Sequence, residues 1–202
     1  MLADPTGPVT PGFDIVALAA SAGGLNALTH VLAALPAEFP AAIVVVQHLD
    51  RRHRSVMADI LNRRSKVAVK EAVQGERLHL GHAYIAPPDH HLLVNPDHTL
   101  ALTQTELVHF VRPSADLLFE SVAASFRDRA IAVVLSGSGS DGAMGVRAIK
   151  KMGGTVIVQD AGAAFAGMPD AARGTGAADF VLGLDEIAPV LDKLCRPSGT
   201  EQ

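Results

Sequence analysis

Short apolar runs that alternate with amphipathic stretches dominate the pattern of hydrophobic and polar positions along this chain. The apolar runs predict buried strands at 15–20, 43–46, 131–135, 155–158 and 180–182. Apolar residues at helical spacing predict helices at 25–35, 55–64, 114–126, 143–152 and 185–194. This alternation of strands and helices predicts an α/β fold with a mostly parallel sheet.

The segment 66–102 departs from that pattern. Its alternating runs are short and are broken by glycine and proline. The polar stretch 95–98, Asn-Pro-Asp-His, separates the apolar runs 92–94 and 100–102, which predicts a hairpin. We interpret the segment as a short hairpin insertion within one domain.

The length and composition of the chain fit a single globular domain. With 202 residues, of which 49 % are apolar, the chain can build one full α/β domain with a substantial core. We expect this domain to span 12–195, with flexible termini at 1–11 and 196–202.

Charge and cysteine content exclude several classes of protein. The formal net charge of −4 gives no basic field for nucleic acid or anionic membranes. The lone Cys195 excludes an internal disulfide and fits a reducing compartment. The N-terminus lacks the regions of a signal peptide, and no apolar run approaches the ~20 residues of a membrane helix. We therefore expect a cytoplasmic protein without membrane insertion.

Polar residues with catalytic potential follow three of the predicted strands. Ser21 follows the first, His48 the second, and Asp141 lies in the glycine-rich loop after the strand at 131–135. The carboxyl ends of parallel strands share one edge of a sheet, where open α/β proteins build their sites. A serine, a histidine and an aspartate that meet there would supply a nucleophile, a base and an orienting carboxylate. Their order in the chain differs from the Ser, Asp, His order of α/β-hydrolases.

Small residues surround Ser21 at the predicted strand-to-helix turn. Ala22, Gly23 and Gly24 would let backbone N–H groups approach a bound atom and stabilise an oxyanion beside the Ser21 hydroxyl. Many phosphate loops share this geometry. The loop 137–142 resembles one, but it lacks the G-x-x-x-x-G-K-[ST] and G-x-G-x-x-G patterns. A small-molecule or nucleotide binder is therefore a weaker hypothesis.

Each of the three polar strand ends also has a purely structural interpretation. Ser21 would serve as the N-cap of the helix that follows it, and Asp141 as the N-cap of the helix at 143–152. His48 would be a hydrogen-bonded histidine at a strand end. The sequence pattern by itself leaves both kinds of interpretation open.

Two further groups of polar residues lie near His48. His48, Asp50 and His53 form a loose cluster whose spacing matches no standard metal site, so we expect no bound metal. A basic stretch runs from Arg51 to Lys66. Such a run is usually a solvated helix face, but beside an active site it could attract an acidic protein substrate.

Six ordered motifs extend over almost the whole chain. They are Ala20-Ser21-Ala22-Gly23-Gly24, Val46-Gln47-His48, Gly81-His82-Ala83-Tyr84-Ile85-Ala86-Pro87, Arg112-Pro113-Ser114-Ala115-Asp116, Gly137-Ser138-Gly139-Ser140-Asp141-Gly142 and Gly167-Met168-Pro169. Together they resemble the catalytic domain of the chemotaxis protein-glutamate methylesterases, the CheB family. The resemblance implies a doubly wound α/β domain with helices on both faces of the sheet, and a serine hydrolase without a cofactor. Such enzymes hydrolyse γ-glutamyl methyl esters on the helical cytoplasmic region of methyl-accepting chemotaxis receptors, and some deamidate receptor glutamines.

Matched residue by residue, the resemblance implies a role for each polar strand end. Ser21 matches the nucleophile, His48 the base and Asp141 the orienting acid. These roles agree with those suggested by the positions of the three residues at the ends of parallel strands.

The resemblance also implies an oxyanion and substrate-binding set. Ala22, Gly23, Ser138 and Arg112 occupy these positions, with backbone amides near Ala22 and Ser138 as the expected oxyanion donors. The chain departs from the family pattern at four places: Ala22 replaces a frequent threonine, Ser138 a methionine, Val111 a histidine, and Leu49-Asp50 the methionine-proline pair after His48. A backbone donor survives at the first two positions, so only side-chain contacts must differ there.

The beginning of the chain differs from that of the larger members of the family, which carry an N-terminal receiver domain. Only about a dozen residues precede the first predicted strand, so we expect a stand-alone catalytic domain or one regulated in trans. Our leading hypothesis is a serine esterase that acts on a chemosensory receptor. The alternative is a non-catalytic adaptor of the same fold that binds receptor helices or another signalling protein.

Overall fold

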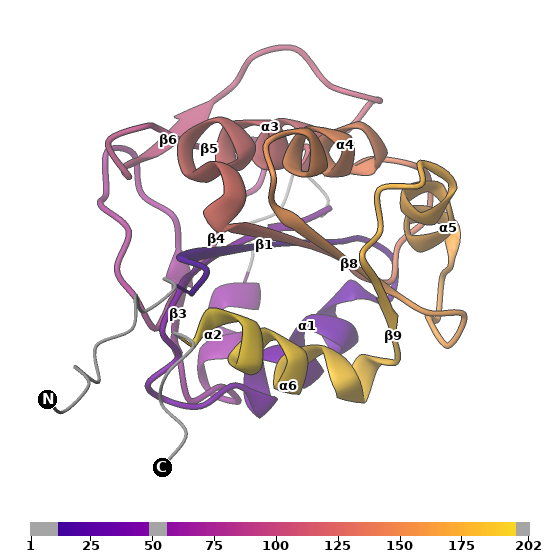
Figure 1. The fold of residues 1–202 in the computed structure, drawn as a ribbon. Helices are drawn as coiled ribbons and strands as arrows, with labels where there is room; N and C mark the ends of the chain where they lie inside the picture. The colour runs from indigo at the N-terminus through magenta and orange to yellow at the C-terminus, as the bar shows by residue number, and fades with distance from the viewer. Residues whose placement is uncertain (1–11, 49–55, 197–202) are drawn as a thin grey trace, which may run out of the picture.

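A parallel sheet forms the middle layer of the protein in the computed structural model, which describes residues 12–48 and 56–196 (Figure 1). Its seven strands have the order β3-β4-β2-β1-β7-β8-β9, and all neighbouring pairs are parallel. The strands are β1 (Ile15–Ala20), β2 (Ala42–Gln47), β3 (Ala68–Glu71), β4 (His82–Ile85), β7 (Ala130–Val134), β8 (Thr155–Gln159) and β9 (Phe180–Leu182). The predicted mostly parallel sheet is therefore confirmed.

Helices cover both faces of this sheet, as the sequence analysis expected (Figure 1). The helices on one face are α1 (Gly24–Ala34), α2 (Met57–Asn62) and α6 (Leu184–Cys195). Those on the other face are α3 (Ala115–Phe126) and α4 (Ala143–Lys151), with α5 (Gly167–Gly174) packed beside α4.

The alternation of side chains along β1 explains why this strand is apolar throughout. Ile15 and Ala17 lie in the core beneath α3 and α4, whereas Val16 and Leu18 lie in the core beneath α1 and α6. All four side chains are buried. A strand that is buried on both faces shows no polar face, so its sequence is a continuous apolar run.

Each strand and helix of the sequence analysis is present, with ends shifted by at most two residues. The predicted hairpin is also present, as the antiparallel pair β5 (His91–Val94) and β6 (Leu100–Thr103). The sequence analysis assigned no strand to β3 or β4, which join the main sheet at one edge. β3 alternates between exposed and buried positions and β4 has only four residues, so neither forms a long apolar run.

Two helical elements also escaped the sequence analysis. α5 begins at Gly167, contains Pro169 and ends at Gly174, and these residues are weak helix formers. Its helical form depends on tertiary packing, because Met168 lies fully buried in the core. The other element is the short 3-10 helix η1 (Arg127–Arg129), which connects α3 to β7.

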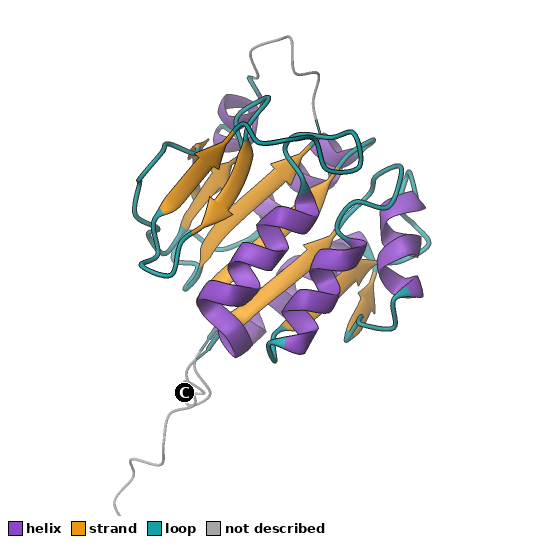
Figure 2. Cartoon of the chain, turned by 90° about the horizontal axis from the view of Figure 1, so that it is seen from above, coloured by secondary structure: helices purple, strands orange, loops and turns teal. Residues whose placement is uncertain are grey.

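The winding of the chain reverses at β1, which makes the C-terminal ends of β1, β2 and β7 a topological switch point. β2, β4 and β3 extend the sheet on one side of β1, and β7, β8 and β9 extend it on the other. Open α/β sheets bind ligands at such a switch point. Figure 2 shows the helices packed over the strands from above. Asp50 and His53 lie outside the described residues, and so do the predicted flexible termini, of which only Arg196 is described.

Candidate catalytic site

The ends of β1, β2 and β7 bring Ser21 and His48 to the same edge of the sheet. β1 lies between the other two strands and is parallel to both. The Ser21 N–H donates to the Ser136 carbonyl (3.0 Å), and the His48 N–H donates to the Ala20 carbonyl (3.1 Å). Ser21 and His48 therefore occupy neighbouring positions just beyond the strands, as expected from a parallel sheet.

The His48 ring contacts Asp141 at this edge. His48 Nε2 lies 2.8 Å from Asp141 Oδ2, and the Asp141 side chain is only 4 % exposed. An ionised carboxylate only accepts hydrogen bonds, so Nε2 carries the hydrogen and Nδ1 is the basic nitrogen of the neutral ring. Within the described residues the Ser21 hydroxyl makes no hydrogen bond, which leaves it available to Nδ1 in a substrate complex.

The first turn of α3 holds the Asp141 carboxylate. Asp141 accepts hydrogen bonds from the Ser114 hydroxyl (2.9 Å) and from the backbone N–H groups of Ala115 (2.6 Å) and Asp116 (3.1 Å). Burial by itself would raise the pKa of Asp141, but the hydrogen bonds from His48 and the two amides outweigh it and lower that pKa. Asp141 is therefore ionised at neutral pH, as an orienting carboxylate must be.

Neither Ser21 nor Asp141 caps the helix that follows it. The N-cap residue of α1 is Gly23 and that of α4 is Gly142, and neither helix has a side-chain cap bond. The N-cap interpretation from the sequence is therefore wrong for both residues. Asp141 instead binds the N-terminus of a different helix, α3.

Asp116 is a second buried carboxylate beside Asp141. Its Oδ1 accepts a hydrogen bond from the Gly145 N–H in α4 (2.7 Å), and its Oδ2 lies 3.4 Å from His109 Nε2. Asp116 of α3 thus binds the first turn of α4, and Asp141, in the loop before α4, binds the first turn of α3. Burial raises the pKa of Asp116, the Gly145 hydrogen bond opposes the rise, and the charge of Asp141 adds to it.

Replacing Asp116 by asparagine is expected to change the pH dependence of stability. Folded protein holds the Asp116 proton above the ordinary pKa of 3.8, so unfolding releases a proton there and rising pH lowers the free energy of unfolding. Asparagine removes this effect, while its carbonyl oxygen can still accept from Gly145. Urea unfolding from about pH 4 to about pH 7 should show the wild type losing stability relative to the variant as pH rises. Parallel pH profiles would contradict this expectation.

Unpaired backbone amides lie on the two loops next to Ser21. In the described part of the chain, the N–H groups of Ala22, Gly23 and Ser138 donate to no protein acceptor. The Ser136 hydroxyl donates to the Ala22 carbonyl (2.8 Å) and so fixes the turn. Gly23 has a φ of 73°, and a Cβ there would lie 2.8 Å from the Ser136 Oγ. The Ala22 and Gly23 amides are therefore unpaired on a turn that Ser136 fixes, and the Ser138 amide is unpaired on the neighbouring loop.

Gln47 links the nucleophile candidate to the base candidate. Its Nε2 donates to the backbone carbonyls of both Ser21 (2.7 Å) and His48 (3.0 Å). Its buried Oε1 has no hydrogen-bond partner among the described residues and faces Gly24, where a Cβ would approach it to 2.0 Å. No role for Gln47 was predicted from the sequence, although a polar residue at the end of an apolar strand and next to His48 was a signal for one.

Replacing Gln47 by methionine is expected to lower kcat by about 10- to 100-fold. The variant lacks the amide that donates to the carbonyls of both Ser21 and His48, so the two residues are no longer held in a fixed relative position. Two partly buried carbonyls also lose a partner, which should lower the free energy of unfolding by about 1–3 kcal/mol. Ester turnover and urea unfolding measure the two effects. Gln74→Met is the matched control, since Gln74 binds the Leu102 N–H on the exposed hairpin. Equal kcat in the two variants would contradict the role of Gln47.

Arg112 occupies a loop that leads into α3. Its guanidinium donates to the Asp89 carboxylate (2.7 and 3.1 Å) and to the carbonyls of Gln104 (3.1 Å) and Thr105 (2.6 Å). All of these contacts lie within the protein and hold this loop against the turn between β4 and β5. A contact between Arg112 and the substrate stays a prediction.

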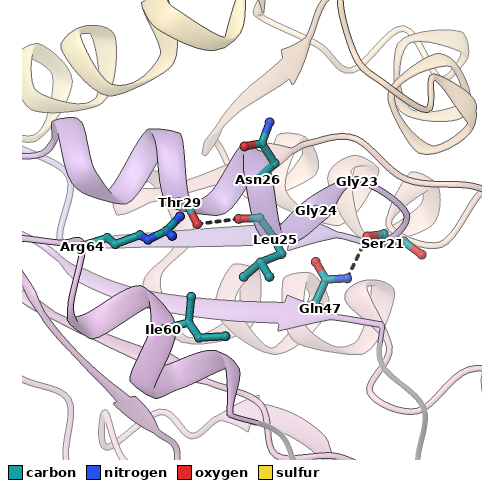
Figure 3. Close-up of a pocket in the computed structure, with 9 residues that line it drawn as sticks. All are labelled: Ser21, Gly23, Gly24, Leu25, Asn26, Thr29, Gln47, Ile60 and Arg64. Carbon is teal, nitrogen blue, oxygen red and sulfur yellow. Dashed lines mark hydrogen bonds between the residues drawn. The ribbon is translucent and has the colours of Figure 1, made fainter.

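A cleft of about 570 Å³ opens from Ser21 and runs between α1 and α2. Figure 3 shows the nine residues that line it, with Ser21 and Gln47 at one end and Arg64 at the other. Leu25 and Ile60 lie between these ends. The cleft is therefore suited to a substrate that extends away from the nucleophile candidate.

Other reactive groups do not compete with this site. No group of three or more His, Cys, Asp and Glu within residues 12–48 and 56–196 has the geometry of a metal site. The thiol of Cys195 is buried, and burial raises its pKa to about 12, so it is a poor nucleophile. Among the described helices, none combines the length and hydropathy needed to cross a membrane.

Comparison with known proteins gives one consistent result. Residues 16–191 match the family model of the CheB methylesterases. The crystal structure of the Thermotoga maritima CheB methylesterase catalytic domain superposes with a TM-score of 0.86 at 36 % identity, covering 92 % of this chain and 100 % of that one.

Curated relatives show the same similarity in sequence. A Leptospira interrogans protein, assigned as a protein-glutamate methylesterase/protein-glutamine glutaminase, is 39 % identical over 183 residues, which are 90 % of this chain and 95 % of that protein. Protein-glutamate methylesterase/protein-glutamine glutaminase 3 of Burkholderia orbicola is 44 % identical over 178 residues, which are 88 % of this chain and 52 % of that protein. The chain thus spans nearly all of the first relative and about half of the second.

Proposed function

Because this chain belongs to the CheB methylesterase family, we propose that it hydrolyses γ-glutamyl methyl esters on the helical cytoplasmic region of a chemosensory receptor. Ser21 is the nucleophile, His48 the base and Asp141 the orienting acid. The observation that supports this most is the 2.8 Å contact of His48 Nε2 with Asp141 Oδ2, at the sheet edge that carries Ser21. The same chemistry with ammonia as the leaving group would deamidate receptor glutamines.

In the first half of the reaction, Ser21 forms an acyl-enzyme. His48 Nδ1 accepts the proton of the Ser21 hydroxyl as its oxygen attacks the ester carbonyl. The amides of Ala22 and Ser138 stabilise the oxyanion of the tetrahedral intermediate. The intermediate collapses when the imidazolium returns the proton to the methoxy oxygen, and methanol leaves. Asp141 fixes the ring and stabilises its positive charge throughout.

In the second half, water releases the receptor glutamate. His48 takes a proton from the water, whose oxygen attacks the acyl carbonyl, and then returns the proton to Ser21 Oγ. The side chains and backbone amides supply every step, so the proposed mechanism uses no metal or cofactor. The substrate class places the protein in the cytoplasm, where the helical signalling region of a receptor lies.

Methanol release from methylated receptor membranes tests this proposal. The wild-type protein should release methanol in proportion to time and enzyme, and a fluorophosphonate probe should label Ser21, as located by mass spectrometry. A small ester, N-acetyl-glutamate α-amide γ-methyl ester, tests the chemistry without a receptor. Folded protein that hydrolyses neither substrate and takes no label would overturn the esterase and leave the adaptor hypothesis.

A further inference from the structure

The cleft that begins at Ser21 contains a positive charge which the proposed reaction does not use. Arg64 follows α2 and lines the cleft at the end away from Ser21 (Figure 3). It is the only charged residue among the nine that line the cleft. Its guanidinium forms no ion pair within the described part of the chain. The cleft therefore presents an uncompensated positive charge to whatever occupies it.

The residues that line the cleft between Ser21 and Arg64 are uncharged, so the charge of Arg64 favours an acidic group. Leu25 and Ile60 are apolar, and the polar Asn26 and Thr29 carry no charge. An acidic group placed at the far end would therefore meet Arg64, and none of the described residues that line the cleft carries a carboxylate. Because a guanidinium binds a carboxylate through two parallel hydrogen bonds, the pairing would fix position as well as charge.

The spacing along α1 gives a length scale for the cleft. Gly24 and Thr29 both line the cleft, and five residues of helix span about 7.5 Å. On a helical substrate, residues four and seven positions from the ester lie about 6 and about 10 Å along the axis. These two axial lengths bracket the roughly 7.5 Å that separates Gly24 from Thr29, both of which line the cleft.

From this geometry, and on the basis of the proposed function, we propose that Arg64 is a specificity residue that binds a carboxylate one to two helical turns from the methyl ester. The substrate class is thereby narrowed to helices that carry an acidic residue at this spacing. Arg64 belongs to the basic stretch from Arg51 to Lys66, and the proposal gives this one residue of the stretch a role in binding an acidic substrate.

Arg63 offers a matched control for the test. It is adjacent to Arg64, exposed and positively charged, but it does not line the cleft. Arg64→Gln and Arg63→Gln therefore remove the same charge from neighbouring positions, and only the first changes the cleft. A general attraction for acidic substrates would respond to both variants alike.

The experiment compares synthetic helical peptides with a central γ-methyl glutamyl ester. One peptide is otherwise uncharged, and the others carry glutamate four and seven residues before or after the ester. The wild type should prefer one acidic peptide over the neutral peptide by about five- to tenfold in kcat/KM. Arg64→Gln should reduce this preference to less than about twofold, whereas Arg63→Gln should keep it. Hydrolysis of the small ester should be equal in all three proteins.

Three results would overturn the role of Arg64: no acidic preference in the wild type, an undiminished preference in Arg64→Gln, or an equal loss in Arg63→Gln. The dissociation constants of the same peptides are also measured with Ser21→Ala and with Ser21→Ala/Arg64→Gln. This binding readout does not depend on turnover. Wild-type protein that hydrolyses neither the methylated receptor nor the small ester and takes no label would contradict the proposed function, whereas the binding preference still tests Arg64.

Discussion

Replacing Ser21 by alanine is expected to abolish methanol release, with kcat reduced by about 10⁴-fold or more. The variant lacks the oxygen that forms the acyl-enzyme, and no other residue at the site can replace it. Asp141 and His48 would remain paired, because their 2.8 Å contact does not involve Ser21. The measurement is methanol release from methylated receptor membranes and from the small ester, at equal protein concentration.

The control for this variant is Ser138→Ala. Ser138 lies on the neighbouring loop with an exposed side chain, and the proposal assigns its backbone N–H, not its hydroxyl, to the oxyanion. This substitution should leave kcat within about threefold of the wild type, since the backbone donor remains. Urea unfolding should show that Ser21→Ala is as stable as the wild type within about 0.5 kcal/mol. Full turnover by folded Ser21→Ala would eliminate the mechanism.

Replacing Asp141 by asparagine is expected to damage both catalysis and stability. For catalysis, the expected loss is about 10⁴-fold in kcat, because an amide no longer holds the His48 ring with Nδ1 as the basic nitrogen. For stability, the N–H groups of Ala115 and Asp116, the Ser114 hydroxyl and His48 all donate to this carboxylate. An NH₂ group opposite these donors leaves some of them unpaired, so the free energy of unfolding should fall by about 3–5 kcal/mol.

The pH dependence of the free energy of unfolding separates the effect of the Asp141 charge from the effect of its shape. The pKa of Asp141 in the folded protein lies below its ordinary value of 3.8, so its charge stabilises the fold above that value. This stabilisation is lost as the pH falls through the folded-state pKa. The asparagine variant has no such loss, so urea unfolding should show the difference between the two proteins shrinking in acid. A constant difference across that range would contradict the ionised state assigned to Asp141.

For Asp116→Asn, we expect the difference in the free energy of unfolding from the wild type to change with pH in the opposite direction. The pKa of Asp116 is raised, so its carboxyl favours the folded state at low pH and disfavours it as the pH rises. Two buried carboxylates at the starts of adjacent helices thus differ because four donors surround Asp141, whereas burial dominates at Asp116. The hydrogen bonds that favour the ionised form of Asp141 suit it to orient a histidine.

The sequence by itself predicted five of the seven strands of the described sheet, most of its helices and the edge at which the polar residues lie. β1 and β7 are buried on both faces, so an apolar run marks each of them without ambiguity. Parallel strands place their carboxyl ends at one edge of a sheet. Because Ser21 and His48 each follow a predicted strand, this rule predicted that both lie at that edge. The sequence could not identify β3, because an edge strand with one buried residue, Val69, has no such pattern.

The tertiary structure decided which partners the polar residues take. Asp141 is followed by a helix in the sequence, yet it binds the start of α3, because α3 and α4 pack side by side. Gln47 reaches two carbonyls that lie 26 residues and one residue away along the chain. Arg64 lines the cleft and Arg63 does not, although the sequence presents them as equals. Periodicity fixes which face of an element is buried, whereas contacts between elements depend on how they pack, which local sequence does not encode.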